Sequence, residues 1–435
     1  MVKAVSVPVQ AVLEQGYRWR IIDDELDVLL SGVAAVALDG PKGIGKTTTA
    51  LQRAASILRL DRVEDRTELK ADPDALLTRP CPLLIDEWQR LAWVWDSVRR
   101  AVDDGAEPGA FLLTGSATPT GEVTHSGAGR IVSLRMRPLA LPERGIAHPT
   151  VSLSALLDGE GAALAGECQL RLPDYVEEIA ASGFPGIRGL PPRVRRIQLD
   201  SYLTRAFTRD LRDEQGVRVR HPATLRAWAR AYAAASSTTT SWEHIRHEAT
   251  PGDGDPPSRA TAVTYRDWLT ALWLLDPVAA WLPVGAGLGK LQQAQKHQLA
   301  DPALVMRLMS LDPAMLMREG RAARHSGGLL GALFESLATQ TVRVLAQAAE
   351  AQTYHMRTAN GAREVDLVVE RFDGRCLGIE VKLTAAPDDD DVRHLRWLRD
   401  KAPDRVADVV ILTTGSRAYR RRDGVGVIPL GLLGP

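Results

Sequence analysis

The chain has 435 residues, of which 45% are hydrophobic and 25% are charged, as is ordinary for a soluble globular protein of two to four domains. Its 54 basic and 54 acidic residues balance, so the net charge neither favours nor excludes a nucleic-acid partner. The three cysteines, Cys81, Cys168 and Cys376, lack the spacing of a structural zinc site and indicate a reducing compartment. Because the sequence shows no signal segment and no apolar run of about 18 residues, we expect a cytoplasmic location and no membrane partner.

An apolar run ending at Leu38 is followed by a segment that matches the phosphate-binding P-loop, Gly40-x-x-x-x-Gly45-Lys46-Thr47. A strand, a glycine loop and a helix expected over 48–60 would bring backbone N–H groups and the positive end of a helix dipole to one point. Lys46 would contact the β- and γ-phosphates of ATP, and the Thr47 hydroxyl would bind Mg²⁺. A glycine-rich turn before a core helix is the weaker alternative, because the full motif occurs in its expected context. The predicted nucleotide-binding residues are Gly40, Pro41, Lys42, Gly43, Ile44, Gly45, Lys46, Thr47 and Thr48.

A second apolar run, over 81–85, ends in Asp86 and Glu87. Such a run is typical of a buried parallel strand, and ligands bind at the carboxyl edge of doubly wound sheets. The pair resembles a Walker B motif, in which Asp86 would hold the Mg²⁺ water shell and Glu87 would polarise the attacking water. The alternative is that both acids cap the helix that follows.

Two further segments carry polar side chains. An apolar strand expected over 111–116 ends in hydroxyl residues, and the segment 129–143 alternates like a strand. The second segment offers Arg130, Arg135 and Arg137. Arg130 could serve as an arginine finger on the nucleotide of a neighbouring subunit, which would require a homo-oligomer; an ordinary solvated arginine explains it equally well.

The order of these motifs resembles a bacterial and archaeal family of AAA-like P-loop ATPases that carry a C-terminal domain of unknown function. The resemblance continues through short motifs at 174–186, 202–211 and 296–304 and covers almost the whole chain. It implies that Thr114, or less strongly Ser116, helps to position the attacking water. A plain strand end is the alternative for both hydroxyls.

The middle of the chain opens with a proline pair at 191–192 and a basic segment that includes Arg205, Arg209 and Arg212. Helices expected over 224–235, 241–248 and 259–275 follow in the order of a winged-helix fold. The residues expected on the exposed face of the third helix, where they could enter a DNA major groove, are Thr261, Thr264, Tyr265 and Arg266. Those expected on its buried face are Val263, Trp268, Leu269, Leu272 and Trp273. A role in packing or protein binding is the alternative.

The C-terminal part carries a second group of acids with a lysine. A helix over 327–347 is expected to be followed by strands over 353–358, 364–370 and 376–383, a helix over 391–401 and a strand over 409–413. Glu380 and Lys382 are two residues apart and would share one face of the sheet. If Asp366 lies at the same height on the next strand, the acids form an oxygen cage for Mg²⁺ with a cation beside the attacking water. A solvated face with cross-strand ion pairs is the alternative.

This arrangement resembles the PD-(D/E)xK nuclease core. Glu335 would be the helix acid, and Asp366, Glu380 and Lys382 follow in the matching order. The resemblance implies that the three acids hold a metal and that Lys382 is catalytic. An intermediate interpretation keeps the fold for nucleic-acid binding without cleavage.

The sequence therefore predicts an α/β chain of three domains. These are an AAA-like P-loop ATPase domain with a parallel sheet and a helical lid over 1–190, a helical and winged-helix domain over 191–320, and a restriction-endonuclease-like α/β domain over 321–435. The predicted function is Mg²⁺-dependent ATP hydrolysis coupled to a nucleic-acid transaction, with DNA as the expected partner and a metal-dependent nuclease tail as an option. The alternative is an ATP-dependent regulatory switch that binds protein partners and has a non-catalytic tail.

Overall fold

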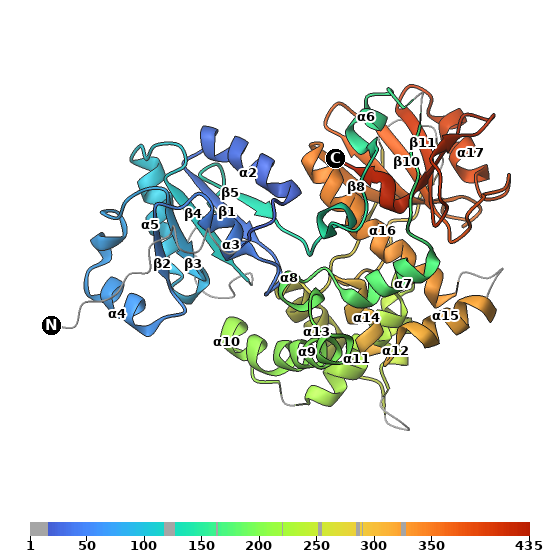
Figure 1. Ribbon diagram of the computed structural model, residues 1–435. Coiled ribbons are helices and arrows are strands. Elements are labelled where there is room, and N and C mark those ends of the chain that lie inside the picture. The colour runs from blue at the N-terminus through green and yellow to red at the C-terminus, as the bar shows by residue number, and fades with distance from the viewer. Residues whose placement is uncertain are drawn as a thin grey trace. The chain divides into compact units, whose positions relative to one another are not determined.

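The computed structural model describes residues 16–116, 127–161, 164–219, 221–250, 255–283, 288, 290–322 and 328–435 (Figure 1). The chain forms two compact units, which are described one at a time. The first is Met1–Arg137 with Thr208–Val219 and Trp268–Trp273, and the second is Pro138–Phe207, Arg220–Asp267 and Leu274–Pro435. Within the described ranges, every helix is either too short or too polar to span a bilayer.

The first unit is built on five parallel strands in the order β2-β3-β4-β1-β5. The strands are β1 (Ala35–Asp39), β2 (Ser56–Arg59), β3 (Leu83–Asp86), β4 (Phe111–Gly115) and β5 (Ile131–Arg135). The helices are α2 (Ile21–Gly32), α3 (Lys46–Leu51), α4 (Val63–Ala71), α5 (Trp93–Asp103) and α10 (Leu211–Gln215), with the short turns η1 (Pro73–Leu76) and η2 (Trp88–Arg90). The three central strands are buried along their apolar length, as expected for a parallel sheet covered on both faces.

Helices cover both faces of this sheet (Figure 1). On one face, Ala35 and Ala37 of β1 share a hydrophobic core with Val94 and Val98 of α5. On the other face, α2 and α3 pack against β1. Because β4 lies between β1 and β3, the carboxyl end of β4 sits between the P-loop and the acidic end of β3.

The helix expected over 48–60 is shorter in the structure, and this expectation was wrong in its second half. Helix α3 ends at Leu51, and Ser56–Arg59 form β2 at the edge of the sheet. Leu58 is fully buried, but as a strand residue. A short apolar pattern suits either helical or strand spacing, and here strand pairing with β3 decided the outcome.

The second unit contains a seven-stranded mixed sheet in the order β12-β13-β11-β10-β9-β8-β7. Its strands are β7 (Ala279–Ala280), β8 (Ala351–Arg357), β9 (Glu364–Arg371), β10 (Cys376–Val381), β11 (Val406–Thr413), β12 (Tyr419–Arg420) and β13 (Gly426–Pro429), and a separate parallel pair is formed by β6 (Val151–Ser152) and β14 (Leu433–Gly434). The pairs β8–β9 and β9–β10 are antiparallel, whereas β10–β11 is parallel. The strands and helices expected in the C-terminal part are therefore all present.

The helices of the second unit support the sheet and build the middle of the chain. They are α6 (Leu153–Leu157), α7 (Leu172–Ala181), α8 (Pro185–Arg188), α9 (Pro192–Arg205), α11 (Pro222–Ala234), α12 (Trp242–Glu248), α14 (Pro302–Leu308), α15 (Pro313–Ala322), α16 (Leu329–Ala348) and α17 (Arg393–Lys401), with the short turns η3 (Leu141–Arg144) and η5 (Leu430–Leu432). The boundary between the units falls within the π-helix η4 (Ala206–Asp210) and within α13 (Arg259–Ala271). Leu395 and Leu398 of α17 pack with Cys376 and Val409 of the sheet. Helix α16 contacts β8 and β10.

The first unit does not run continuously from Arg137 to the domain boundary expected at residue 190. Residues Pro138–Phe207 belong to the second unit, where Leu141 N donates to Thr341 Oγ1 at 3.2 Å. The guanidinium of Arg144 is buried and donates to Gln340 Oε1 at 3.1 Å. A buried guanidinium needs fixed acceptors, and α16 supplies one of them.

Two residues of helix α13 differ from the expected division into exposed and buried faces, whereas Leu269 and Leu272 are buried as expected. Tyr265 is only 6% exposed and packs edge-on against Trp228 of α11, with the ring centroids 6.4 Å apart. Val263, expected in the core, is 45% exposed. The assignment of exposed and buried faces was therefore wrong for these two residues, and Trp228 of α11 packs against the tyrosine ring.

Candidate functional site

The P-loop joins the end of β1 to the start of α3. Gly40 passes so close to the backbone that a Cβ atom there would lie 2.4 Å from the carbonyl oxygen of Met136. Gly45 precedes the first helical residue with φ of 99°, a left-handed conformation that favours glycine. Both glycines of the motif are thus required by the path of the chain.

The Lys46 ammonium is held inside this loop. Its Nζ donates to the carbonyl oxygens of Gly40 at 2.7 Å and Pro41 at 2.8 Å, and the residue is 6% exposed. Burial lowers the pKa of Lys46 to about 8, although Glu87 and Asp39 oppose this change. The ammonium therefore lies at the loop where the sequence places the phosphates.

Thr47, Asp86 and Thr114 meet at the carboxyl edge of the sheet. Thr47 Oγ1 donates to Asp86 Oδ1 at 2.8 Å, and Thr114 Oγ1 donates to the same oxygen at 2.5 Å. Hydroxyl and carboxylate oxygens are the ligands that Mg²⁺ prefers. The donor set at Thr47 and Asp86 therefore fits this ion.

Glu87 lies in the turn after β3, in a left-handed conformation with φ of 56°. Its Oε2 accepts hydrogen bonds from Ser116 Oγ at 2.9 Å and from Gln89 Nε2 at 2.5 Å. The Glu87 side chain makes no capping hydrogen bond to the turn that follows. These contacts favour a polar cluster over the capping alternative, and they add Gln89, which the sequence patterns did not single out.

Two charged residues near the P-loop make contacts that the sequence patterns did not indicate. Lys42 Nζ pairs with Asp210 Oδ1 at 2.8 Å. The buried Arg20 donates to Ile44 O at 3.1 Å and to Arg137 O at 3.0 Å. Arg20 thereby links the P-loop to the segment that follows β5. No local sequence motif indicates this long-range contact.

The arginine-finger candidate lies at the amino-terminal ends of the strands, opposite the carboxyl ends that carry the P-loop. Arg130 precedes β5, and its Nε donates to Asp103 Oδ1 at 2.8 Å at the end of α5. Because β5 runs parallel to β1, and the P-loop follows the carboxyl end of β1, Arg130 lies at the end of the sheet away from the P-loop. Arg135, at the carboxyl end of β5, is the arginine that the register places beside Asp39. A role for Arg130 on a neighbouring subunit's nucleotide stays a prediction.

In the second unit, the structure brings the predicted acids and the lysine together. The ladder between β9 and β10 ends with Leu367 opposite Ile379, so the register places Asp366 opposite Glu380. Lys382 Nζ lies 3.0 Å from Glu380 Oε2 and 3.9 Å from Asp366 Oδ2. The geometric condition set by the sequence is met; the metal and the catalytic role of Lys382 stay predictions.

A further cation, Lys296, lies inside this cluster. Its Nζ is 2.8 Å from Glu335 Oε1, 3.2 Å from Asp366 Oδ1 and 3.5 Å from Glu364 Oε1, and its side chain is 1% exposed. We refer to Glu335, Glu364, Asp366 and Glu380 with Lys296 and Lys382 as the carboxylate–lysine cluster. Lys296 was part of a motif noted in the sequence, but no periodicity placed it beside these acids.

The pKa values in the carboxylate–lysine cluster diverge. Burial raises the pKa of Glu335 to about 8, against the opposing effect of Lys296. Burial and the neighbouring Asp366 raise the pKa of Glu380 well above its usual range. Burial alone would also raise the pKa of Asp366, but Lys296 and Lys382 outweigh it and hold that pKa below its usual range. The two lysines thus favour the ionised form of Asp366, whereas burial opposes the ionised forms of Glu335 and Glu380.

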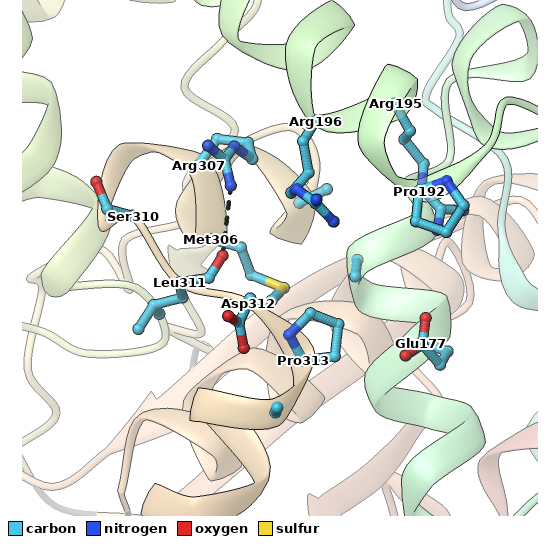
Figure 2. A pocket seen from close by; sticks show the side chains of 13 residues that line it. Glu177, Pro192, Arg195, Arg196, Met306, Arg307, Ser310, Leu311, Asp312 and Pro313 are labelled. Carbon is cyan, nitrogen blue, oxygen red and sulfur yellow. Dashed lines mark hydrogen bonds between the residues drawn. The ribbon is translucent and has the colours of Figure 1, made fainter.

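A pocket of about 520 Å³ lies beside the basic helix α9 (Figure 2). Arg195 and Arg196 line it from α9, and Arg307 lines it from α14. Glu177 and Asp312 bring acidic side chains to the same pocket, and Arg307 is also paired with Asp200 at 2.9 Å. The basic segment expected from the sequence thus contributes arginines to a concave surface.

The parallel sheet, the P-loop and the acidic strand end define the first unit as a P-loop ATPase domain. Residues 33–144 match the family model described as AAA domain. Residues 172–314 and 330–433 match two models described as domains of unknown function, DUF8612 and DUF4143. The ATPase class of the N-terminal part is therefore confirmed, whereas the nuclease-like class of the C-terminal part stays a prediction.

Among known proteins, the chain is similar to Uncharacterized protein Rv2008c of Mycobacterium tuberculosis and Uncharacterized protein Mb2031c of Mycobacterium bovis. Each is 28% identical over 414 residues, covering 91% of this chain and 79% of the relative. Among solved structures, the Walker-type ATPase PABY2304 of Pyrococcus abyssi matches with a TM-score of 0.37 and 14% identity, over 68% of this chain and 99% of that one. The ORC2 protein of Aeropyrum pernix matches with a TM-score of 0.30 and 15% identity, over 69% of this chain and 96% of that one.

Proposed function

We propose that this protein is an Mg²⁺-dependent ATPase that couples ATP binding and hydrolysis to a transaction on nucleic acid, with DNA as the partner. The observation that carries the ATPase part is the meeting of Thr47, Thr114 and Asp86 at one carboxylate oxygen. Beside it, Glu87 is held by Ser116 and Gln89. Such a cluster next to a buried P-loop lysine suits phosphate binding and water activation.

The residues at the P-loop and at the carboxyl ends of β3 and β4 each have a role in this proposal. The loop N–H groups and Lys46 bind the phosphates, and Lys46 exchanges its bonds to loop carbonyls for bonds to phosphate oxygens. Thr47 and Asp86 would hold Mg²⁺, which would offset the charge that develops on the transferred phosphoryl group. Glu87 orients and polarises the attacking water. Ser116 and Gln89 fix the direction of the Glu87 carboxylate.

The nucleic-acid part of the proposal is supported by arginines of the second unit. Besides the pocket beside α9 (Figure 2), a smaller pocket of about 180 Å³ is lined by side chains that include Trp242 and Arg266. The Arg266 guanidinium lies over the Trp242 ring, 5.4 Å from its centroid. One arginine guanidinium can donate two parallel hydrogen bonds to a phosphate. Nucleic-acid bases stack on aromatic rings, and arginines add cation–π contacts to them.

The C-terminal sheet serves in this proposal as a nucleic-acid-binding module. Its strand order and the convergence of Asp366, Glu380 and Lys382 support the resemblance to a nuclease core. The Lys296 ammonium among the same acids favours binding without cleavage. Nucleotide binding would arrange the second unit on DNA, and hydrolysis would reset it.

The coupling is tested by the affinity of the full chain for duplex, single-stranded and branched DNA, with and without ATP. We expect an ATP-dependent change in affinity and a steep loss of binding with added salt. Arg196→Gln should weaken binding and lower the salt slope by about one, whereas the charge-matched control Arg62→Gln, at the exposed start of α4 in the first unit, should not. An absence of binding at low salt would refute the nucleic-acid part and favour the regulatory switch.

A further inference from the structure

The Lys296 side chain is buried at the centre of the second unit's acids, and its position is fixed by the backbone. Lys296 N donates to Val278 O at 2.9 Å, and Val278 N donates to Lys296 O at 2.9 Å. The next residue, His297, is held through Nε2 against Thr240 O at 2.7 Å. These backbone hydrogen bonds therefore fix the position of Lys296 beside the acids.

The acids around Lys296 are arranged for an ammonium. Nζ donates to Glu335 Oε1 at 2.8 Å and to Asp366 Oδ1 at 3.2 Å, which are N–H···O distances. Ligand oxygens lie only about 2.0–2.1 Å from Mg²⁺, so an ion at the position of Nζ would be too far from both oxygens to bind them directly. In the part of the chain that the structure describes, no group of three or more His, Cys, Asp and Glu side chains has the geometry to hold a metal ion.

The oxygens of Asp366 are also already engaged. While Oδ1 faces Lys296, Oδ2 accepts a hydrogen bond from Val381 N at 3.0 Å and faces Lys382 at 3.9 Å. Asp366 is the acid that the nuclease-like arrangement would require as a metal ligand. As the site stands, its residues do not fit a divalent cation.

We propose that the Lys296 ammonium takes the place of a divalent cation in the carboxylate–lysine cluster. Lys296 keeps the acids together without a metal, so the wild-type tail binds no Mg²⁺ or Mn²⁺ and does not cleave nucleic acid by a metal-dependent route. The same acids become a cation site once the ammonium is removed and space is left for an ion. This inference concerns the second unit alone and does not depend on ATP hydrolysis by the first.

The test is a Mn²⁺ titration of the full chain without nucleotide or DNA, followed by electron paramagnetic resonance of bound Mn²⁺ and by thermal unfolding. Lys296→Ala removes the charge and leaves room, whereas Lys296→Met removes the charge and fills the space. Lys401→Met, at the exposed end of α17, controls for loss of a lysine elsewhere. The double variant Lys296→Ala with Asp366→Asn removes the site that the first change would open.

We expect Lys296→Ala to bind about one more Mn²⁺ per chain than wild type and its unfolding temperature to rise with Mn²⁺ by more than that of wild type. Lys296→Met, Lys401→Met and the double variant should match wild type in both measurements, because the Thr47 and Asp86 site is the same in every chain. A Lys296→Ala chain that folds only with Mn²⁺ would support the proposal as well. Mn²⁺ bound by wild type and lost in the double variant would overturn it, as would a Lys296→Ala chain that gains no Mn²⁺ or fails to fold with Mn²⁺ present.

Discussion

We predict that the change Glu87→Gln separates ATP binding from ATP hydrolysis. Glutamine keeps the size of the side chain and can still bond to Ser116 Oγ, which lies 2.9 Å from Glu87 Oε2. It cannot accept a proton or polarise water as a carboxylate does. Loss of a general base costs about 10²–10⁴ in rate, or about 3–5 kcal/mol of transition-state stabilisation. We expect kcat to fall by that factor while ATP affinity stays within about twofold, because Lys46, Thr47 and Asp86 are unchanged.

Steady-state phosphate release and binding of a fluorescent ATP analogue measure the two quantities. The matched control is Glu64→Gln, which removes an exposed carboxylate from α4 and should change neither. Ser116→Ala should lower kcat by a smaller factor, because it removes the Ser116 bond to Glu87 and leaves the Gln89 bond in place. If Glu87→Gln hydrolyses ATP at a rate near that of wild type, Glu87 is not the group that prepares the water.

Three further predictions concern the two sites. Gly40→Ala should lower the free energy of unfolding by about 1–3 kcal/mol, since the new Cβ would meet a backbone carbonyl at 2.4 Å, whereas Gly32→Ala, which meets nothing within 4 Å, should not; equal thermal stability of the two variants would contradict the assigned P-loop path. Because burial lowers the pKa of Lys46 to about 8, the ammonium loses its proton above that pH, so ATP affinity should fall by up to about tenfold per unit above pH 8; a flat profile to pH 10 would show that its charge is not used. Asp366→Asn should cost up to about 3–5 kcal/mol in urea unfolding, because it removes one of the three carboxylates around the buried Lys296 ammonium. The exposed Asp373→Asn should cost less; the reverse order would refute the buried ion pair.

The P-loop unit could be predicted from the sequence because its chemistry is local. Gly40, Gly45 and Lys46 lie within one loop, and the acids at 86–87 directly follow an apolar strand. Parallel strands then bring their carboxyl ends to one edge by topology alone. The structure adds Gln89 to this group through a contact two residues away from Glu87, which no known motif marks.

The contacts that could not be predicted join residues far apart in the sequence. Lys296 is separated by 39 residues from Glu335 and by 70 from Asp366, and a single lysine on an extended segment has no periodic signal. Arg20 reaches Arg137 O across 117 residues for the same reason. Tyr265 was predicted to be exposed but is buried. Helical spacing shows which residues share a face of a helix, but it does not show which neighbouring helix covers that face.

The central claim is that the P-loop unit hydrolyses ATP in a manner coupled to nucleic acid. It is tested most directly by the steady-state ATPase rate of the full chain in Mg²⁺, with and without duplex, single-stranded and branched DNA. We predict a basal rate that is abolished by Lys46→Ala, preserved in the exposed-lysine control Lys70→Ala, and changed several-fold by at least one DNA structure. A rate that survives Lys46→Ala, or one that no DNA structure alters at low salt, would contradict the account.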